Sequence, residues 1–260
     1  MDKNLSYIYG LIQTDGSFSE YSRNRGRIAI ELQEGDVDIL YKIQSLLSCT
    51  SSLRFRQRDT NFKKGYKSSI LTIFDLKFRE ELKKYGMISG KKDEVIFPPI
   101  NTQYSEIDYI RGLLDGDGSI GVTSQNIPYI SFITKSEKIA DYYIDALHKY
   151  LNIYKISSRN IRDNAFNIMV TNENAQFWSR ILYYPECLSL NRKYLKAQEV
   201  IKWQRPTTRK KIDFTRKKWT EEEDIVILEK SLNEAISLLN RTEQSIKLRL
   251  WRLNNLKVNN

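Results

Sequence analysis

The chain has 260 residues, a formal net charge of +10 and a sequence pI of about 9.4, a surplus that favours a polyanionic partner without identifying it. Its two cysteines, Cys49 and Cys187, are too few and too far apart for a disulfide framework or a thiolate zinc site. They fit a reducing compartment, so we expect an intracellular protein, cytoplasmic (in a prokaryote or phage) or organellar, and neither secreted nor membrane-bound. The one histidine, His148, argues against Ser-His-Asp or His-metal catalysis.

The first hundred residues are expected to follow the order helix, two strands, helix, two strands, helix. An apolar helix covers residues 5–14, and two strand-like runs lie in residues 17–33 around a polar turn. A second helix opens at Gly35 and Asp36, and Asp75 caps the third. The strands between these two helices are expected at residues 52–58 and 67–73.

Pro98 and Pro99 mark a joint, after which the same order of elements is expected again. The chain is therefore expected to be α+β, with two pseudo-symmetric αββαββα repeats at residues 1–100 and 101–204. The strands of the second repeat are placed at residues 119–124, 129–135, 155–161 and 166–171, and its later helices at 136–151 and 174–183.

One pattern, an apolar helix that ends in an Asp-Gly-Ser turn, occurs at residues 8–18 and again at 110–120, an offset of 102 (112 − 10). Each copy has small residues at i and i+4, a spacing that lets two helix backbones approach closely. These small residues are Gly10, Thr14, Gly112 and Gly116.

Two carboxylates, Asp15 and Asp117, then fall at the C-terminal ends of two facing helices. The helix dipole disfavours negative charge there, and two nearby carboxylates repel each other. A divalent cation bound between them would offset both costs. The alternative is that both stretches are only packing helices followed by turn residues.

These two stretches, Ile-Tyr-Gly-Leu-Ile-Gln-Thr-Asp-Gly and Ile-Arg-Gly-Leu-Leu-Asp-Gly-Asp-Gly, resemble the LAGLIDADG motif of homing endonucleases in its two-motif, single-chain form. The resemblance covers roughly residues 1–204 and departs at the sixth motif position, which is Gln13 in one copy and Asp115 in the other. It implies sheets that form a DNA-binding saddle. It also implies Mg²⁺ held by the eighth-position acids and by nearby backbone carbonyls. The implied metal-site residues are Asp15, Asp117, Thr14 and Gly116.

The family places a basic residue from each half beside the metal-bound waters. The resemblance carries this role onto Lys91 and Lys193, which are also 102 residues apart, with Lys92 as an alternative to Lys91. Gln33 and Lys135, at the same offset, match a polar position at the rim of the family's active site. With Asp15 and Asp117, these are the expected catalytic residues. The alternative for the lysines and the glutamine is a solvated surface position.

Strand 52–58 carries Arg54, Arg56 and Arg58 at period two, so the three share one sheet face. They would repel one another without an anion, and arginine suits bidentate contact with guanine edges and phosphates. Because the resemblance implies a concave sheet in the major groove, we expect them to contact DNA; the alternative is a solvated charged face. Further contacts are expected from Arg23, Arg25, Arg27, Lys155, Ser157 and Arg159.

After Trp203 the composition changes to a basic linker, residues 205–218, and then to a predicted three-helix module, residues 219–260. This small all-α module resembles a Myb/SANT-like helix-turn-helix that binds DNA through its third helix; the alternative is a helical cap packed on the core. The resemblance rests on Trp219, Thr220, Glu223, Asp224 and the turn Asn240-Arg241-Thr242. The candidate DNA contacts are Ser245, Lys247, Arg249 and Arg252.

The resemblance as a whole implies an intron-encoded, monomeric homing endonuclease that hydrolyses DNA in a metal-dependent reaction and leaves a staggered cut. The implied partner is double-stranded DNA with a long, pseudo-palindromic site, and for some family members also their own intron RNA. The alternative is an RNA-splicing maturase or a non-cleaving DNA-binding regulator on the same fold. Loss of the eighth-position acids would favour that alternative, and both acids are present.

Overall fold

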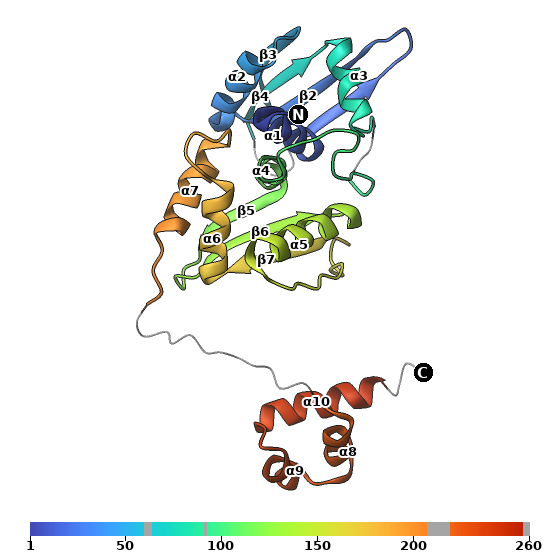
Figure 1. The fold of residues 1–260 in the computed structure, drawn as a ribbon, viewed down its shortest axis with the longest axis vertical. Helices are drawn as coiled ribbons and strands as arrows, with labels where there is room; N and C mark the ends of the chain where they lie inside the picture. The colour runs from blue at the N-terminus through green and yellow to red at the C-terminus, as the bar shows by residue number, and fades with distance from the viewer. Residues whose placement is uncertain (60–63, 91–92, 207–218, 257–260) are drawn as a thin grey trace. The chain divides into compact units, whose positions relative to one another are not determined.

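A computed structural model describes residues 1–59, 64–90, 93–206 and 219–256 of the chain. The chain divides into two compact units, Met1–Arg205 and Pro206–Asn260 (Figure 1). None of the helices in the described ranges is both long and apolar enough to cross a membrane.

The first half of the larger unit is a four-stranded antiparallel sheet with three α-helices. Asp2 begins the first helix by accepting a hydrogen bond from the Leu5 amide at 2.7 Å, and Asp75 caps the third as predicted, with the Phe78 amide at 2.8 Å. The strand order is β1-β2-β4-β3, so β3 is an edge strand. The elements are α1 (Lys3–Thr14), β1 (Gly16–Glu20), β2 (Gly26–Gln33), η1 (Glu34–Asp36), α2 (Val37–Leu46), β3 (Ser51–Arg58), β4 (Tyr66–Ile73) and α3 (Leu76–Lys84).

The second half repeats this plan with one strand fewer. Its antiparallel sheet has the order β5-β6-β7, and Ser136 caps the helix that follows β6 by accepting from the Ile139 amide at 3.2 Å. A helix that was not predicted, α7, follows the last repeat helix. The elements are α4 (Glu106–Asp117), β5 (Gly118–Val122), β6 (Pro128–Thr134), α5 (Glu137–Leu151), β7 (Phe166–Thr171), α6 (Asn172–Leu182) and α7 (Asn191–Lys202). The mixed α/β class with two sheets is confirmed.

The strand predicted at residues 155–161 is not formed, and that prediction was wrong. The segment makes only one isolated bridge, between Arg159 and Phe166. Its two isoleucines are fully exposed, Ile156 at 101% and Ile161 at 105%. A strand needs one face buried to hold its register, and none of residues 155–161 is buried.

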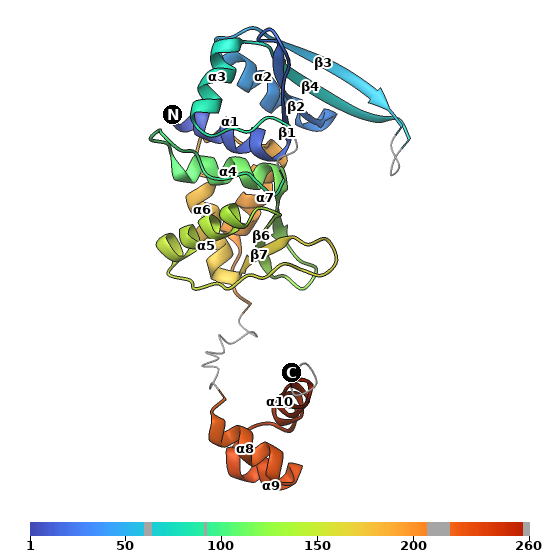
Figure 2. The ribbon, with the colours of Figure 1, turned by 90° about the vertical axis from the view of Figure 1, so that its right-hand side faces the viewer.

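Helices α1 and α4 lie side by side between the two sheets (Figure 2). A Cβ atom at Gly10 would overlap the Tyr109 carbonyl oxygen, and one at Gly112 would overlap the Tyr7 carbonyl oxygen. A Cβ atom at Gly116 would overlap the Thr14 hydroxyl. The predicted close approach of the motif helices through small residues is therefore confirmed.

The smaller unit is a three-helix module with a small core of Ile227, Ala235 and Ile246. Capping boxes start its first two helices, at Thr220 as predicted and at Ser231. The Arg241 guanidinium lies 3.8 Å from the ring centroid of Trp219 and is ion-paired with Glu223 at 2.6 Å. The helices are α8 (Glu221–Glu229), α9 (Leu232–Leu239) and α10 (Glu243–Leu256).

Candidate active site

The two motif acids stand where α1 and α4 end. Asp15 is the C-cap residue of α1 and is half-buried, and Asp117 is the exposed last residue of α4. Asp15 lines a hollow of about 420 Å³ together with Ser17, Arg27, Arg54 and other residues of the first sheet. The two helices thus present one carboxylate each at the same end of the α1–α4 pair.

Asp117 lines a second hollow, of about 500 Å³, together with Gln13, Thr14 and Lys135. Thr14 comes from α1 and Asp117 from α4, so this hollow straddles the two helices. The predicted rim lysine Lys135, one residue after β6, therefore does lie with a motif acid. Its counterpart Gln33 lines neither hollow.

Lys193, near the start of α7, is buried to 5% exposure beside the end of α4. Its ammonium donates to the carbonyl oxygens of Leu114 and Asp115, each at 2.6 Å, and of Gly118 at 2.9 Å. These three bonds use all of the donors of Lys193 and tie it to the last turn of α4, where the Leu114 carbonyl also accepts from the Gly118 amide. Burial lowers the pKa of Lys193 to about 8, although the charges of Asp115, Asp15 and Asp117 oppose that shift.

Asp115, the sixth residue of the second motif copy, is a fully buried carboxylate. It accepts hydrogen bonds from the Tyr7 hydroxyl at 2.7 Å, the Tyr183 hydroxyl at 2.8 Å and the Leu190 amide at 2.7 Å. Burial raises the pKa of Asp115 above its ordinary value, although the Lys193 charge and these hydrogen bonds oppose the shift. Three donors converge on the group, an arrangement that suits the ionised carboxylate.

The first motif copy has the neutral counterpart of this arrangement. The Tyr109 hydroxyl donates to Gln13 Oε1 at 2.6 Å, and Gln13 Nε2 donates to the Phe97 carbonyl at 2.9 Å. Tyr7 and Tyr109 are also 102 residues apart (109 − 7), so each helix supplies a tyrosine to the sixth position of the other. The sequence interpretation missed this exchange, although the offset that relates the motifs relates the tyrosines too.

This symmetry supplies a matched pair of variants. Tyr7→Phe is expected to lower the free energy of unfolding by about 1.5–3 kcal/mol, because it removes a bond to a charged acceptor. Tyr109→Phe removes a bond to a neutral acceptor and is expected to cost about 0.5–1.5 kcal/mol. Urea denaturation of the two variants measures the difference. Equal losses would show that Asp115 is not held as a buried anion.

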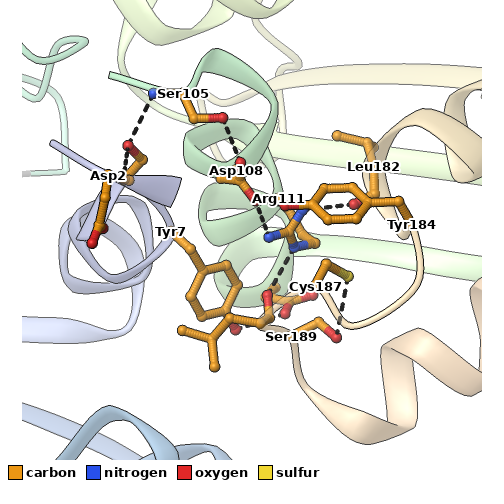
Figure 3. Close-up of polar contacts among 12 residues, drawn as sticks. Asp2, Tyr7, Ser105, Asp108, Arg111, Leu182, Tyr184, Cys187 and Ser189 are labelled. Atoms are coloured by element: carbon orange, nitrogen blue, oxygen red, sulfur yellow. Dashed lines mark hydrogen bonds and ion pairs between the residues drawn. The ribbon is translucent and has the colours of Figure 1, made fainter. Parts of the chain in front are cut away.

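Arg111 fastens α4 to the segment that leads into α7 (Figure 3). The buried guanidinium donates to the carbonyl oxygens of Leu182 and Leu188, both at 2.8 Å, and to Asp108. Asp108 also accepts from Tyr184 at 2.7 Å. By holding the Leu188 carbonyl, Arg111 fixes the backbone that presents the Leu190 amide to Asp115.

The oxygen donors at the helix ends suit a hard divalent cation. Within the described ranges no group of three or more His, Cys, Asp or Glu residues is placed to hold a metal. The Thr14 hydroxyl donates to the carbonyls of Gly10 and Leu11 at 3.2 and 3.1 Å, so the expected contribution of Thr14 is its backbone carbonyl. Carboxylate and carbonyl oxygens are the donors that Mg²⁺ and Ca²⁺ prefer.

Residues 105–178 match the family model of a LAGLIDADG-like domain. Mesophilic variants of the homing endonuclease I-DmoI superpose with a TM-score of 0.51 at 12% identity, over 76% of this chain and 97% of theirs. The chain has the LAGLIDADG homing endonuclease fold. I-DmoI in complex with DNA and Ca gives a TM-score of 0.50 at 12% identity, with the same coverage. A mutant of I-SmaMI gives 0.50 at 13% identity, over 96% of this chain and 98% of its own. No curated protein matches the sequence.

On the first sheet of this LAGLIDADG fold, the arginines of β3 lie on the face opposite the buried apolar residues. Arg54 and Arg56 line the Asp15 hollow. Glu31 of β2 reaches Arg58 at 3.2 Å and Arg56 at 4.0 Å. The Glu31 carboxylate therefore offsets part of the repulsion among the three arginines.

The other predicted residues are dispersed around the LAGLIDADG core. Arg27 lines the Asp15 hollow, whereas Arg23 and Arg25 occupy the β1–β2 turn, where Arg25 donates to the Ser22 carbonyl at 3.4 Å. Gln33 donates to Asp36 at 2.9 Å, and Arg192 of α7 binds the same carboxylate at 2.9 Å. Gln33 thus helps to join the first half to α7. Lys91 and Lys92 lie outside the described residues.

The predicted contacts of the second repeat do not lie on its sheet. Lys155, Ser157 and Arg159 belong to the segment between α5 and β7, because the strand expected there does not form. Arg159 donates to the Asn164 carbonyl at 2.8 Å and lies 4.6 Å from the Phe166 ring centroid. Its guanidinium therefore takes part in holding this segment against β7.

Helix α10 is the helix predicted to contact DNA, and two of its basic side chains form ion pairs within the smaller unit. Arg249 makes two bonds to Asp224 of α8, at 2.7 and 2.6 Å, and Lys247 is ion-paired with Glu243 at 2.6 Å. Ser245 is half-buried. The side chain of Arg252 lies outside the described part of the chain.

Proposed function

We propose that the chain is a site-specific homing endonuclease that hydrolyses both strands of duplex DNA with a divalent metal, Mg²⁺, and leaves a staggered cut. The observation that carries this proposal is the pair of acids, Asp15 and Asp117, at the ends of two packed helices. Asp15 lines a hollow beside the first sheet, and Asp117 lines a hollow beside the second. Two sheets with one acid each suit a duplex with one scissile bond per strand.

We assign the residues of the chain different roles in cation binding and in catalysis. Asp15 and Asp117, with the backbone carbonyls of Thr14 and Gly116, would hold the cation. Bound there, a divalent cation would polarise a phosphoryl oxygen and stabilise the leaving oxygen. The Lys193 ammonium fixes the end of α4 and so orients Asp117. Lys135 lies in the Asp117 hollow, where its charge would stabilise negative charge that develops on the phosphate.

The decisive experiment selects cleaved duplexes from a randomised DNA pool. Purified full-length chain is incubated with the pool in Mg²⁺ and, separately, in EDTA, and cut ends are sequenced on both strands. We expect one recurring sequence, cut on both strands only in Mg²⁺, with offset cut positions. Specific binding with no cut would overturn the nuclease proposal and favour a maturase or a DNA-binding regulator.

The arginines of β3 are proposed to anchor the half-site that faces the first sheet. Arg54→Ala is expected to weaken binding by about 1–3 kcal/mol if the side chain contacts a base bidentately. A phosphate contact would instead reduce the slope of log K against log salt by about one. Lys42→Ala, on the exposed surface of α2, is the control and should change neither quantity. Unaltered binding in Arg54→Ala, Arg56→Ala and Arg58→Ala would place this strand away from DNA.

The C-terminal residues are proposed to add a second DNA contact. Residues 207–218 hold six Lys/Arg and one Asp, whereas residues 219–256 hold five Lys/Arg and seven Asp/Glu, so net charges are +5 (6 − 1) and −2 (5 − 7). The salt-dependent part of the added affinity should therefore come from the linker.

Two truncations separate the linker from the three-helix module. Arg205 is bound by Glu173 through two bonds of 2.6 Å, so the shorter chain should end after Arg205. A chain that ends after Lys218 keeps the linker. Compared with the full-length chain, the chain that ends after Arg205 should bind DNA more weakly, with a smaller slope of log K against log salt and a footprint shortened on one side. The chain that ends after Lys218 should keep the full-length salt slope. Cleavage at saturating protein should persist in both, and full-length footprints for both would refute a DNA contact by this region.

A further inference from the structure

The two sheets differ in charge. Strands β1 to β4 include Arg27, Glu31, Arg54, Arg56 and Arg58. Strands β5, β6 and β7, read over their described spans, contain no charged residue. The strands of the first sheet thus carry charged side chains and those of the second sheet do not, although the two sheets are related by an internal repeat.

The outward face of the second sheet carries a compact patch of two exposed apolar side chains and one exposed amide, with a serine, Ser131, that is only 7% exposed. Ile133 and Met169 are 41% and 42% exposed. Ile133 is opposite Asn167 in the β6–β7 register, and Met169 is opposite Ser131, so the two apolar residues are diagonal neighbours. Ser131 donates to Asn167 Oδ1 at 2.8 Å, which holds the amide between them. We call Ser131, Ile133, Asn167 and Met169 the β6–β7 patch.

The β6–β7 patch is continuous with the candidate active site. Ile133 lines the same hollow as Asp117 and Lys135. The opposite face of these strands is buried: Ile130, Phe132 and Ile168 are each no more than 2% exposed. DNA that reached Asp117 along this sheet would therefore meet the β6–β7 patch and not the apolar core.

We propose that the β6–β7 patch recognises A·T base pairs in the half-site that the second sheet faces; this rests on the proposed function. In the major groove only thymine presents a methyl group, and apolar side chains such as Ile133 and Met169 read it by contact. An asparagine amide such as that of Asn167 can pair with the N6 and N7 edge of adenine. The patch offers no charge for phosphate or for bidentate guanine contact, which the arginine-bearing first sheet supplies.

The test replaces thymine by deoxyuridine, which keeps every hydrogen-bonding group and removes only the C5 methyl. Duplexes bound by the full chain are first selected from a randomised pool in Ca²⁺, and the Arg54→Ala footprint identifies the half-site of the first sheet. Thymines of the other half-site are then replaced singly. We expect about fourfold weaker binding for each contacted methyl that is removed. The same replacement in the half-site of the first sheet serves as the internal control and should have less effect.

Variants link the methyl effect to the patch. In the double variant Ile133→Ser, Met169→Ser the deoxyuridine penalty should vanish, because serine has no methyl group with which to contact the thymine methyl. Phe177→Ser, at a 52% exposed residue of α6, is the matched control and should keep the full penalty. A second half-site without preferred A·T pairs, or a deoxyuridine penalty that persists in the double variant, would overturn this inference alone. If no duplex is enriched, the proposed function itself fails.

Discussion

Asp15→Asn and Asp117→Asn should each abolish double-strand cleavage, with a single-turnover rate reduced more than about a hundredfold, while DNA affinity changes little. Asparagine keeps the shape of the side chain but removes the charge that a divalent cation needs. The same changes remove an unfavourable interaction with the helix dipole, worth about 0.3–1 kcal/mol, and also a favourable interaction with the Lys193 ammonium, so the free energy of unfolding should change by no more than about 1 kcal/mol. Cleavage should therefore be lost while the fold is kept.

Single-turnover cleavage of a duplex labelled on both strands, with binding measured in Ca²⁺, tests this expectation. Asp38→Asn, at an exposed aspartate of α2, is the matched control and should cleave like the parent chain. Full cleavage by both motif variants would sink the assignment of the site. A parallel loss of affinity and rate would instead make the two acids part of the binding surface only.

Lys193→Met should both destabilise the chain and slow cleavage. The Leu114, Asp115 and Gly118 carbonyls lose the Lys193 ammonium, although that of Leu114 keeps the Gly118 amide as a donor, and leaving a buried polar group unsatisfied costs about 1–3 kcal/mol. The loosened helix end carries Asp117, so the cleavage rate should fall further than DNA affinity does. Lys196→Met, at an exposed lysine of the same helix, should do neither.

The pKa of Lys193 gives this prediction a pH signature. The group titrates near 8 when folded and near 10.5 when exposed, so between these values the unfolded chain binds more protons. Its burial therefore disfavours folding below pH 8, and this penalty is relieved as the pH rises toward 10.5. The stability difference between the parent chain and Lys193→Met should widen from pH 7.5 to pH 9.5 in urea denaturation. A constant difference would show that Lys193 is not held as a desolvated cation.

Local patterns in the sequence were sufficient for much of the fold. The spacing of Gly10 and Gly112 predicted the helix crossing, and Asp75 and Thr220 predicted helix starts, because each of these effects acts within one turn or one contact. The strand at residues 155–161 failed because its pattern does not show whether a neighbouring face exists to cover it. Tertiary packing settles that question, and here it leaves Ile156 in solvent.

The site was predicted less completely than the fold, for the same reason. Asp15 and Asp117 follow from the motif, but the bond from Tyr7 to Asp115 exists only because two helices cross in one particular register. The proximity of Glu31 to Arg58 depends on β4 lying between β2 and β3, which is not the order of the strands in the sequence. The position of Lys193 under α4 depends on α7, a helix absent from the predicted repeat.

The unequal sixth positions also bear on which partners the motif helices can take. Gln13 donates to the Phe97 carbonyl, whereas Asp115 accepts from the Leu190 amide. Two copies of α4 paired with each other would bury two Asp115 carboxylates across one interface, which charge repulsion disfavours. The same repulsion is absent from the α1–α4 pair, where Asp115 meets the Tyr7 hydroxyl instead of a second carboxylate.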